Sequence, residues 1–345
     1  MRMPFLPISR YTEMFIYVGC GDGEGLRVYQ ANNAYTSWQT VQHLPMEDPL
    51  VRFVPYANKK MLYCLHAVRP LVSAFAIDPH TGKLRLVNRV NAGGLHPAGA
   101  ALSRDGGFLL VAHADSPHLG IIPLAADGAL CPAKPTITLP GQARALDVTM
   151  APNGRFAIIT DAGENKLCVL RFDPTSGLAN QHQVIRARPV DAPHRAVFHP
   201  TMPLLYVSNK GNSTVTAYHW NAIEGRISFA QSIRTIPSDW NNINIAADIT
   251  ISPDGRYLYL ANRGHDSIVI FAIQPGRGKL FMRAREAPGH TPHGLAWSTD
   301  GTNFLVANRD GNSIARYGVI LANGMLTRQE PNISVPQPTA IAWID

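Results

Sequence analysis

A pattern of two apolar runs separated by a polar turn recurs along the chain, and this repeat constrains the fold more than any other feature. Its plainest copy is ISPDGRYLYLANR at 251–263. Short apolar runs bounded by Gly, Pro, Asn or Asp predict β-strands joined by tight turns. Close copies lie at 150–162 and 198–210, and weaker ones at 102–114, 297–309 and near 54–67.

The spacing of the repeat predicts its architecture. The second apolar run of each copy starts at Phe15, Met61, Phe108, Phe156, Leu204, Tyr257 and Asn303. These starting residues are 46, 47, 48, 48, 53 and 46 residues apart. Seven units of about 40–50 residues are typical of a β-propeller, in which each unit is a four-stranded blade. A solenoid could have repeats of the same length, so the chain ends must decide between the two.

The two ends of the chain complement each other. The first unit, FIYVG, has no apolar run and turn before it, whereas the last unit is followed by PTAIAWID at 338–345. This tail matches PHGLAWSTD at 292–300, a run that precedes the second strand of a blade. Pairing of 338–345 with Phe15–Val18 would close a ring and remove two exposed sheet edges. The sequence therefore predicts an all-β, seven-bladed propeller as a single domain over residues 14–345, with residues 1–13 as an N-terminal arm.

Strand positions within a blade follow from the same alignment. The run before the turn is expected to be the innermost strand and the run after it the second strand. DSIVIFAI at 266–273 is expected to be a third strand, and GKLFMRAREA at 279–287 an outer fourth strand. The extra residues of the 53-residue unit fall near 236–249, and long loops in regular arrays often carry function.

Composition limits the classes of partner. Hydrophobic residues make up 46% and charged residues 16% of the 345 residues, as in a protein with a large core. The net charge of +7 favours anionic partners, and we expect a small anionic metabolite. No dense Lys/Arg run or aromatic–basic motif supports nucleic acid, and no apolar stretch approaches the 18 residues of a membrane span.

The cysteines and the N-terminal segment point to an ordinary intracellular setting. Cys20, Cys64, Cys131 and Cys168 form no C-x-x-C pair, and the first residues lack the apolar core of a signal peptide. We expect a cytoplasmic protein with reduced cysteines, no cofactor, no metal, and a monomeric or weakly homo-oligomeric state.

Charged residues at the ends of one predicted hairpin suggest a binding site. His194 and Arg195 stand at the start of its inner strand, and Lys210 stands at the end of its second strand. Both ends of such a hairpin should face the same mouth of the central channel. Aligned residues in other blades are His293 at the position of His194, Asp147 and Asp248 at that of Arg195, and Arg263 and Arg309 at that of Lys210.

The distribution of these cations is uneven around the ring. Lys210, Arg263 and Arg309 lie on three consecutive blades, whereas the first four blades have Gly21, Ala67, Ala114 and Ala162 there. A cationic side facing an open side suits an anion, because guanidinium groups bind carboxylate or phosphate with two parallel hydrogen bonds. We expect Arg195, Lys210, Asp248, Arg263 and Arg309 to bind substrate. His293 or His194 would transfer protons, and Asp147 would assist.

Structural roles compete with these assignments. The three cations could be solvated or paired with Asp147, Asp248 or Asp310. A histidine on an inner strand is often a hydrogen-bonding core residue. Asp248 could hold a neighbouring backbone turn, and His199, in the turn FHPT, is expected to be structural.

Three segments resemble the seven-bladed propeller lactonase family, which includes bacterial 6-phosphogluconolactonases and fungal 3-carboxy-cis,cis-muconate cyclases. They are DAPHRAVFHP, YVSNKGNSTV and AADITISPDGRYLYLANR. The resemblance covers the chain from about Met14 to Asp345, and it retains Asp248 and the pair Asn262-Arg263.

The expected catalytic positions of that family are altered. The family usually has Gly-Pro-Arg-His where this chain has Ala192-Pro193-His194-Arg195, and Asn-Glu where this chain has Asn209-Lys210. A family histidine on the preceding inner strand falls near Leu146. His293 and Asp147 are the candidates to replace the missing proton-transfer groups.

Three functions remain open at this point. The resemblance favours a lactone hydrolase acting on an anionic sugar lactone. A muconate-type cycloisomerase would use the same cations to bind a dicarboxylate, without net addition of water. The third possibility is a non-catalytic propeller that binds a ligand or a protein. Such a protein would not need the Glu and the His that the family has and this chain lacks.

Overall fold

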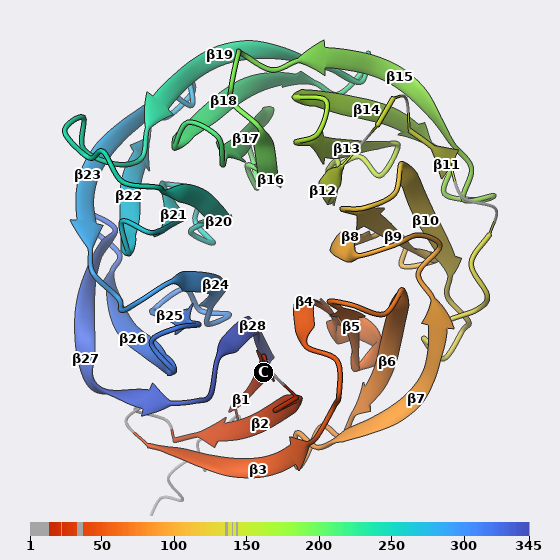
Figure 1. Ribbon diagram of the computed structural model, residues 1–345, viewed down its shortest axis with the longest axis vertical. Coiled ribbons are helices and arrows are strands. Elements are labelled where there is room, and N and C mark those ends of the chain that lie inside the picture. The colour runs from red at the N-terminus through yellow and green to blue at the C-terminus, as the bar shows by residue number, and fades with distance from the viewer. Residues whose placement is uncertain are drawn as a thin grey trace, which may run out of the picture.

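The computed structural model describes residues 14–21, 23–32, 37–134, 137–139, 141–142 and 144–344. Within them, seven four-stranded antiparallel sheets surround a central channel (Figure 1). The predicted all-β, seven-bladed propeller is confirmed. The proposed arm at 1–13 lies outside the described residues.

Each blade runs outward from the channel in the predicted order. The assignments of 266–273 and 279–287 to a third and a fourth strand are confirmed by β22 and β23. A turn of 3-10 helix, η1 (Ala57–Lys59), links two strands of blade 2. Listed from the innermost strand outward, blade 1 contains β28 (Pro338–Ile344), β1 (Met14–Cys20), β2 (Leu26–Ala31) and β3 (Trp38–Leu44); blade 2 contains β4 (Leu50–Tyr56), β5 (Met61–His66), β6 (Leu71–Ile77) and β7 (Leu84–Asn91); blade 3 contains β8 (Pro97–Leu102), β9 (Phe108–His113), β10 (His118–Pro123) and β11 (Ile137–Thr138); blade 4 contains β12 (Ala145–Met150), β13 (Phe156–Asp161), β14 (Lys166–Phe172) and β15 (Ala179–Arg186).

The other three blades follow the same plan, and the long loop expected near 236–249 lies between blades 5 and 6, ending where β20 begins. Blade 5 contains β16 (Pro193–Phe198), β17 (Leu204–Asn209), β18 (Thr214–Asn221) and β19 (Arg226–Arg234); blade 6 contains β20 (Ile245–Ile251), β21 (Tyr257–Arg263), β22 (Ser267–Ile273) and β23 (Leu280–Glu286); blade 7 contains β24 (Pro292–Trp297), β25 (Asn303–Asn308), β26 (Ser313–Ile320) and β27 (Met325–Ser334).

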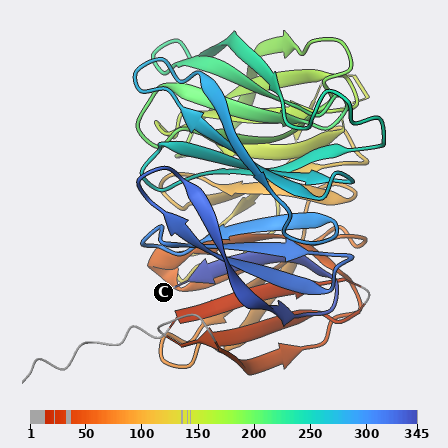
Figure 2. The ribbon, with the colours of Figure 1, turned by 90° about the vertical axis from the view of Figure 1, so that its left-hand side faces the viewer.

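The C-terminal strand closes the ring as predicted. β28 pairs antiparallel with β1, and Phe15 lies opposite Ile344 while Val18 lies opposite Ile341. β1 and β28, the first and last strands that the structure describes, therefore lie side by side in one blade, as the adjacent red and dark blue strands of Figure 2 show. Blade 1 thereby gains the inner strand that its N-terminal segment lacks.

Buried apolar side chains hold neighbouring blades together. The second strands are almost fully buried on both faces, which explains their continuous apolar runs. The described residues form seven hydrophobic clusters, and each one joins side chains of two adjacent blades, including blades 7 and 1. Burial of apolar area is the dominant favourable term in folding, so closure of the ring completes the core.

A repeated tyrosine–glycine hydrogen bond connects blades at their outer turns. The hydroxyls of Tyr17 and Tyr259, for example, donate to the carbonyl oxygens of Gly82 and Gly324 on the following blade, at 2.9 and 2.6 Å. Gly324 has φ of 73°, and a Cβ there would lie 2.4 Å from the ring of Tyr257. The turn therefore needs glycine for its conformation and for its close approach to the neighbouring blade.

His199 also joins two blades, in the structural role expected from the sequence. Its Nδ1 accepts hydrogen bonds from the backbone N–H groups of Thr201 and Met202, so Nε2 carries the proton and donates to the carbonyl oxygen of Gly255 at 2.8 Å. The histidine shapes its own turn and fastens it to the equivalent turn of blade 6.

Candidate active site

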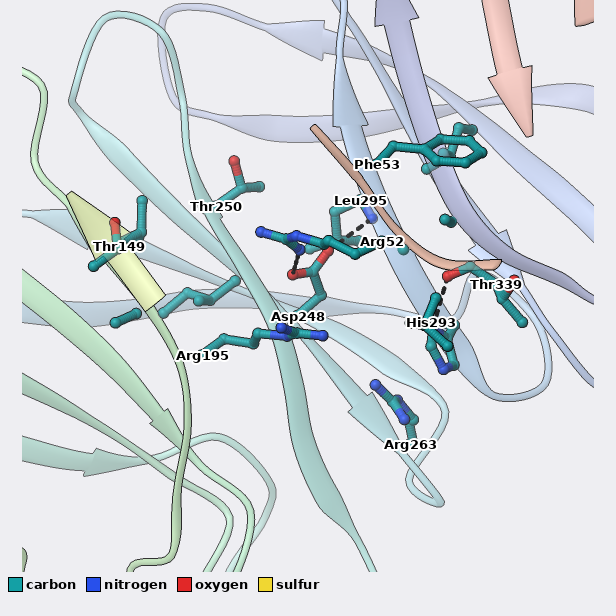
Figure 3. Close-up of a pocket in the computed structure, with 17 residues that line it drawn as sticks. Arg52, Phe53, Thr149, Arg195, Asp248, Thr250, Arg263, His293, Leu295 and Thr339 are labelled. Atoms are coloured by element: carbon teal, nitrogen blue, oxygen red, sulfur yellow. Dashed lines mark hydrogen bonds and ion pairs between the residues drawn. The ribbon is translucent and has the colours of Figure 1, made fainter. Parts of the chain in front are cut away.

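A cavity of about 330 Å³ lies at the centre of the ring, between the inner strands. Its size is at the lower end of the range for small-molecule sites. The charged and titratable side chains that line it are Arg52, Arg195, Asp248, Arg263 and His293, and the side chains of Thr149, Thr250 and Thr339 add hydroxyl groups (Figure 3). Three guanidinium groups against one carboxylate make this cavity suited to an anion.

A shared irregularity positions these side chains. The inner strands of blades 2 to 7 each contain a register shift near their start, as in the shift between Pro193 and Arg195 of β16. Such bulges re-aim side chains and are common beside functional sites. The residue nine positions before the start of the second strand then falls in one ring around the channel. In blades 2 to 7 this residue is Arg52, Gly99, Asp147, Arg195, Asp248 and Gly294.

Arg195 is held tightly by the preceding blades. Its Nη1 donates to the carbonyl oxygens of Ala98 and Leu146, both at 3.0 Å, and to Oδ1 of Asp147 at 3.2 Å. Oδ2 of Asp147 accepts from the backbone N–H of Ala196 at 3.1 Å. Both oxygens of Asp147 are thus engaged in a buried network, and Asp147 lies behind Arg195 rather than among the residues that line the cavity.

Asp248, on blade 6, makes the same kind of contact with the backbone of blade 7. Its Oδ2 accepts from the N–H of Leu295 at 3.2 Å, so it holds the neighbouring inner strand rather than the backbone turn expected from the sequence. Its Oδ1 accepts from Nη1 of Arg52 at 3.3 Å. Burial disfavours the charged form of Arg52, but Asp248 and then Asp147 outweigh it and raise the pKa of Arg52.

Arg263 contributes a guanidinium group to the cavity from the end of β21. No hydrogen bond or ion pair of its side chain is found among the described residues, and its Nε is buried without a partner. Burial, followed by repulsion from Arg195, lowers the pKa of Arg263 to about 10. The side chain is half-buried, and Asp248 and Asp310 oppose the lowering of its pKa only in part, so an anion in the cavity would be favoured beside it.

His293 faces the same cavity with a defined orientation. Its Nδ1 lies 2.8 Å from the carbonyl oxygen of Thr339, to which only a protonated Nδ1 can donate (Figure 3). Burial, and then the positive charges of Arg263 and Arg195, hold the pKa of His293 well below its usual range. The ring is therefore neutral at pH 7, and its Nε2 has a free lone pair that can accept a proton.

The other three candidates, His194, Lys210 and Arg309, do not line the cavity. His194 is half-buried, and its pKa is well below the usual range because of burial and the charges of Arg195, Arg263 and Lys210. Burial, then Arg144 and Arg263, lower the pKa of Lys210. Arg309 is exposed, and its Nε lies 3.9 Å from Asp310, the pairing considered as its structural alternative.

The structure thus brings four of the eight sequence-derived candidates into the cavity: Arg195, Asp248, Arg263 and His293. Asp147 supports Arg195, while His194, Lys210 and Arg309 lie outside the cavity lining. Arg52 was missed by the sequence reasoning. The signal was present, because Arg52 precedes Met61 by nine residues, as Arg195 precedes Leu204.

The donor set does not resemble a metal site. Within the described parts of the chain, no three His, Cys, Asp or Glu side chains come together in a way that could hold a metal ion. Guanidinium, imidazole and hydroxyl groups instead suit a polar anionic ligand. Nor does any helix among these residues have the length and apolar character needed to cross a membrane.

Fold and site together define a seven-bladed β-propeller with an arginine-lined cavity in its central channel. The sequence model of the family "Lactonase, 7-bladed beta-propeller" matches residues 6–343, and the chain belongs to this family. The resemblance stated from three segments is therefore confirmed.

Individual relatives agree with this assignment. The chain is 28% identical over 329 residues to a 6-phosphogluconolactonase of Formosa agariphila, covering 89% of this chain and 91% of the relative. It is 26% identical over 284 residues to a 6-phosphogluconolactonase of Bacillus subtilis, covering 79% and 80%. The fold is similar to that of the Pseudomonas aeruginosa periplasmic gluconolactonase PpgL, with a TM-score of 0.89, 22% identity, and coverage of 96% of this chain and 99% of that one.

Proposed function

We propose that the chain is a lactone hydrolase that acts on an anionic sugar lactone, in the manner of a 6-phosphogluconolactonase. The observation that carries this proposal is the placement of a neutral, oriented imidazole, His293, in a cavity with three guanidinium groups. Relatives named 6-phosphogluconolactonase, matching over most of both chains, support the same activity.

The chemistry follows from the positions of these groups. Nε2 of His293 takes a proton from a water molecule while the water oxygen forms a bond to the lactone carbonyl carbon. Arg263, with Arg195, stabilises the negative charge that develops on the carbonyl oxygen. The carbon–oxygen bond of the ring then breaks, and the protonated His293 returns its proton to the leaving ring oxygen. The products are a free hydroxyl group and a carboxylic acid, which releases its proton to solvent and becomes a carboxylate.

The remaining residues have supporting roles in this proposal. Asp147 positions Arg195 and does not contact substrate. Lys210 and Arg309 attract the anion at the mouth, and His194 is the alternative base. The small anionic metabolite as partner, the absence of a cofactor, a role in carbohydrate metabolism, a cytoplasmic location and a monomeric or weakly homo-oligomeric state stay predictions.

Substitution of the proposed base provides the test. We expect His293→Ala to lower kcat on 6-phosphoglucono-δ-lactone by about 10²- to 10⁴-fold, the usual contribution of general base catalysis, with a smaller change in KM. The measurement is proton release above spontaneous hydrolysis, with unphosphorylated glucono-δ-lactone as a second substrate.

The control is His182→Ala, which removes an imidazole from the outer strand β15 and should not change the rate. A larger loss in His194→Ala would move the base to His194. Anion binding without turnover of either lactone would reject the enzyme and favour the binding-propeller alternative.

A further inference from the structure

The contact between Arg52 and Asp248 crosses the channel. Arg52 lies on blade 2 and Asp248 on blade 6, which are not neighbours in the ring (Figure 1). Both residues occupy the same position of their inner strands, and both line the cavity. The pair therefore lies in the path of any ligand that fills the cavity, as the central position of the two side chains in Figure 3 shows.

Arg52 is held far more loosely than its counterpart Arg195. Among described residues, the Arg52 side chain makes a single hydrogen bond, 3.3 Å long, and remains 32% exposed. Arg195 has three acceptors and is 11% exposed. A guanidinium group has five N–H donors, so most of those of Arg52 are available to a ligand.

Asp248 can release Arg52 without moving. Its Oδ2 stays bonded to the N–H of Leu295, which keeps the carboxylate on blade 6. An anion that enters between Arg263 and Arg52 would compete with Oδ1 of Asp248 for the guanidinium group of Arg52. Carboxylate and phosphate oxygens can offer two parallel contacts where Asp248 offers one, so exchange favours the ligand.

We infer that Arg52 is a further ligand-binding residue, which exchanges its contact with Asp248 for an anionic group of the bound molecule. The nature of that molecule, an anionic lactone or its carboxylate product, rests on the proposed function, whereas the exchange does not. Asp248 thereby sets the affinity of the site by competing for Arg52. The ligand is an anion that contacts blade 6 through Arg263 and blade 2 through Arg52.

The experiment measures anion binding without turnover. Inorganic phosphate and gluconate are titrated into the full-length protein and its variants by isothermal calorimetry, and thermal melting confirms that each variant is folded. We expect Arg52→Ala to weaken binding about tenfold to a hundredfold, the worth of a hydrogen bond to a charged group. Arg52→Lys should recover only part of this loss. The control Arg85→Ala removes the same charge from the exposed face of β7 in the same blade and should leave affinity unchanged.

A double-mutant cycle distinguishes exchange of the Arg52–Asp248 contact from the simple effect of removing the negative charge of Asp248. Asp248→Asn should tighten phosphate binding about two- to fivefold, because Arg52 no longer has to leave an ion pair. In the Arg52→Ala background the same substitution should give a clearly smaller gain.

Three results would overturn the inference: no binding of either anion to the unaltered protein, an unchanged affinity in Arg52→Ala, or an equal gain from Asp248→Asn in both backgrounds. The inference and the proposed function fail separately. If Arg52→Ala loses anion binding but the unaltered protein hydrolyses neither lactone, the proposed enzymatic function is rejected and the exchange is retained. If lactone turnover depends on His293 but does not change in Arg52→Ala, the exchange is rejected and the proposed enzymatic function is retained.

Discussion

Asp147 and Asp248 occupy the same position in blades 4 and 6, yet they hold their arginines in different ways. Each accepts a hydrogen bond from the backbone of the next blade, at Ala196 or Leu295. The partner of Asp147 comes from the adjacent blade 5, and the Asp147 side chain is 3% exposed. The partner of Asp248 comes from across the channel, and Asp248 is 15% exposed.

The difference shows how one repeated position serves two purposes. Backbone contact between neighbouring blades is the common structural task of the two carboxylates. The second oxygen is free to differ, because in each case it accepts from an arginine of another inner strand. On blade 4 it completes a closed network around Arg195, and on blade 6 it borders the cavity, where its contact can be exchanged. The following predictions test this contrast, from the largest expected effect to the smallest.

The first prediction concerns the cost of removing each carboxylate. Asp147→Ala leaves the buried Arg195 without its counter-charge, and we expect it to lower the free energy of unfolding by about 3–5 kcal/mol. Asp248→Ala should cost about 1–3 kcal/mol, mainly because the N–H of Leu295 loses its acceptor. Equilibrium denaturation in urea measures both values. Equal losses would mean that the two pairs are alike.

The second prediction separates binding from stability at Arg263. Its side chain makes no hydrogen bond to any residue that the structure describes, so Arg263→Ala should leave the free energy of unfolding unchanged or raise it. The same change should weaken phosphate or gluconate binding by about 1.5–3 kcal/mol, or tenfold to a hundredfold. Arg263→Lys should recover little, because an ammonium group cannot replace a planar fork. An affinity that ignores Arg263 would place the anion elsewhere.

The third prediction is a loss of stability in mild acid. Burial is the main reason that the pKa values of His66, His113, His194 and His293 are lowered in the folded protein. Unfolding restores a pKa of about 6.5, so the unfolded chain binds more protons below that pH. The free energy of unfolding should therefore fall as the pH drops below about 6.5, by up to about 1.4 kcal/mol per pH unit for each histidine, and should not depend on these groups at higher pH.

The contribution of His293 to this loss of stability in acid should respond to a ligand in the cavity, whereas that of the histidines elsewhere should not. His293 lies beside Arg263 in the cavity, so bound phosphate should favour its protonated form and reduce the slope. His293→Gln should also reduce it. Denaturation curves between about pH 5 and 8, with and without phosphate, provide the measurement. A slope that neither change alters would assign the acid loss to histidines outside the cavity, among them His66 and His113.

The smallest effect is expected at the outer turns. Tyr259→Phe removes the hydrogen bond to Gly324 and should lower the free energy of unfolding by about 0.5–1.5 kcal/mol. Because this bond lies far out on the blade, anion affinity should be unchanged. A change in phosphate binding in this variant would show that blade packing, rather than the channel residues alone, controls the cavity.

The sequence alone determined the fold and the approximate position of the site. Its apolar runs recur at a nearly constant spacing, and a repeat that cannot bury both faces alone must stack on neighbours. The unmatched strand at 338–345 then determined closure with Phe15–Val18. The same alignment located Arg195, Asp248, Arg263 and His293, because equivalent positions of a propeller converge on one channel.

Only the tertiary structure decided which charges meet. Arg52 and Asp248 are 196 residues apart, and nothing in a local pattern distinguishes a contact across the channel from one between adjacent blades. Nor could spacing show that Asp147 lies behind Arg195 while Asp248 borders the cavity. Ion pairing depends on side-chain direction, on burial and on competing backbone donors, and these are determined only when all seven blades have closed around a common axis.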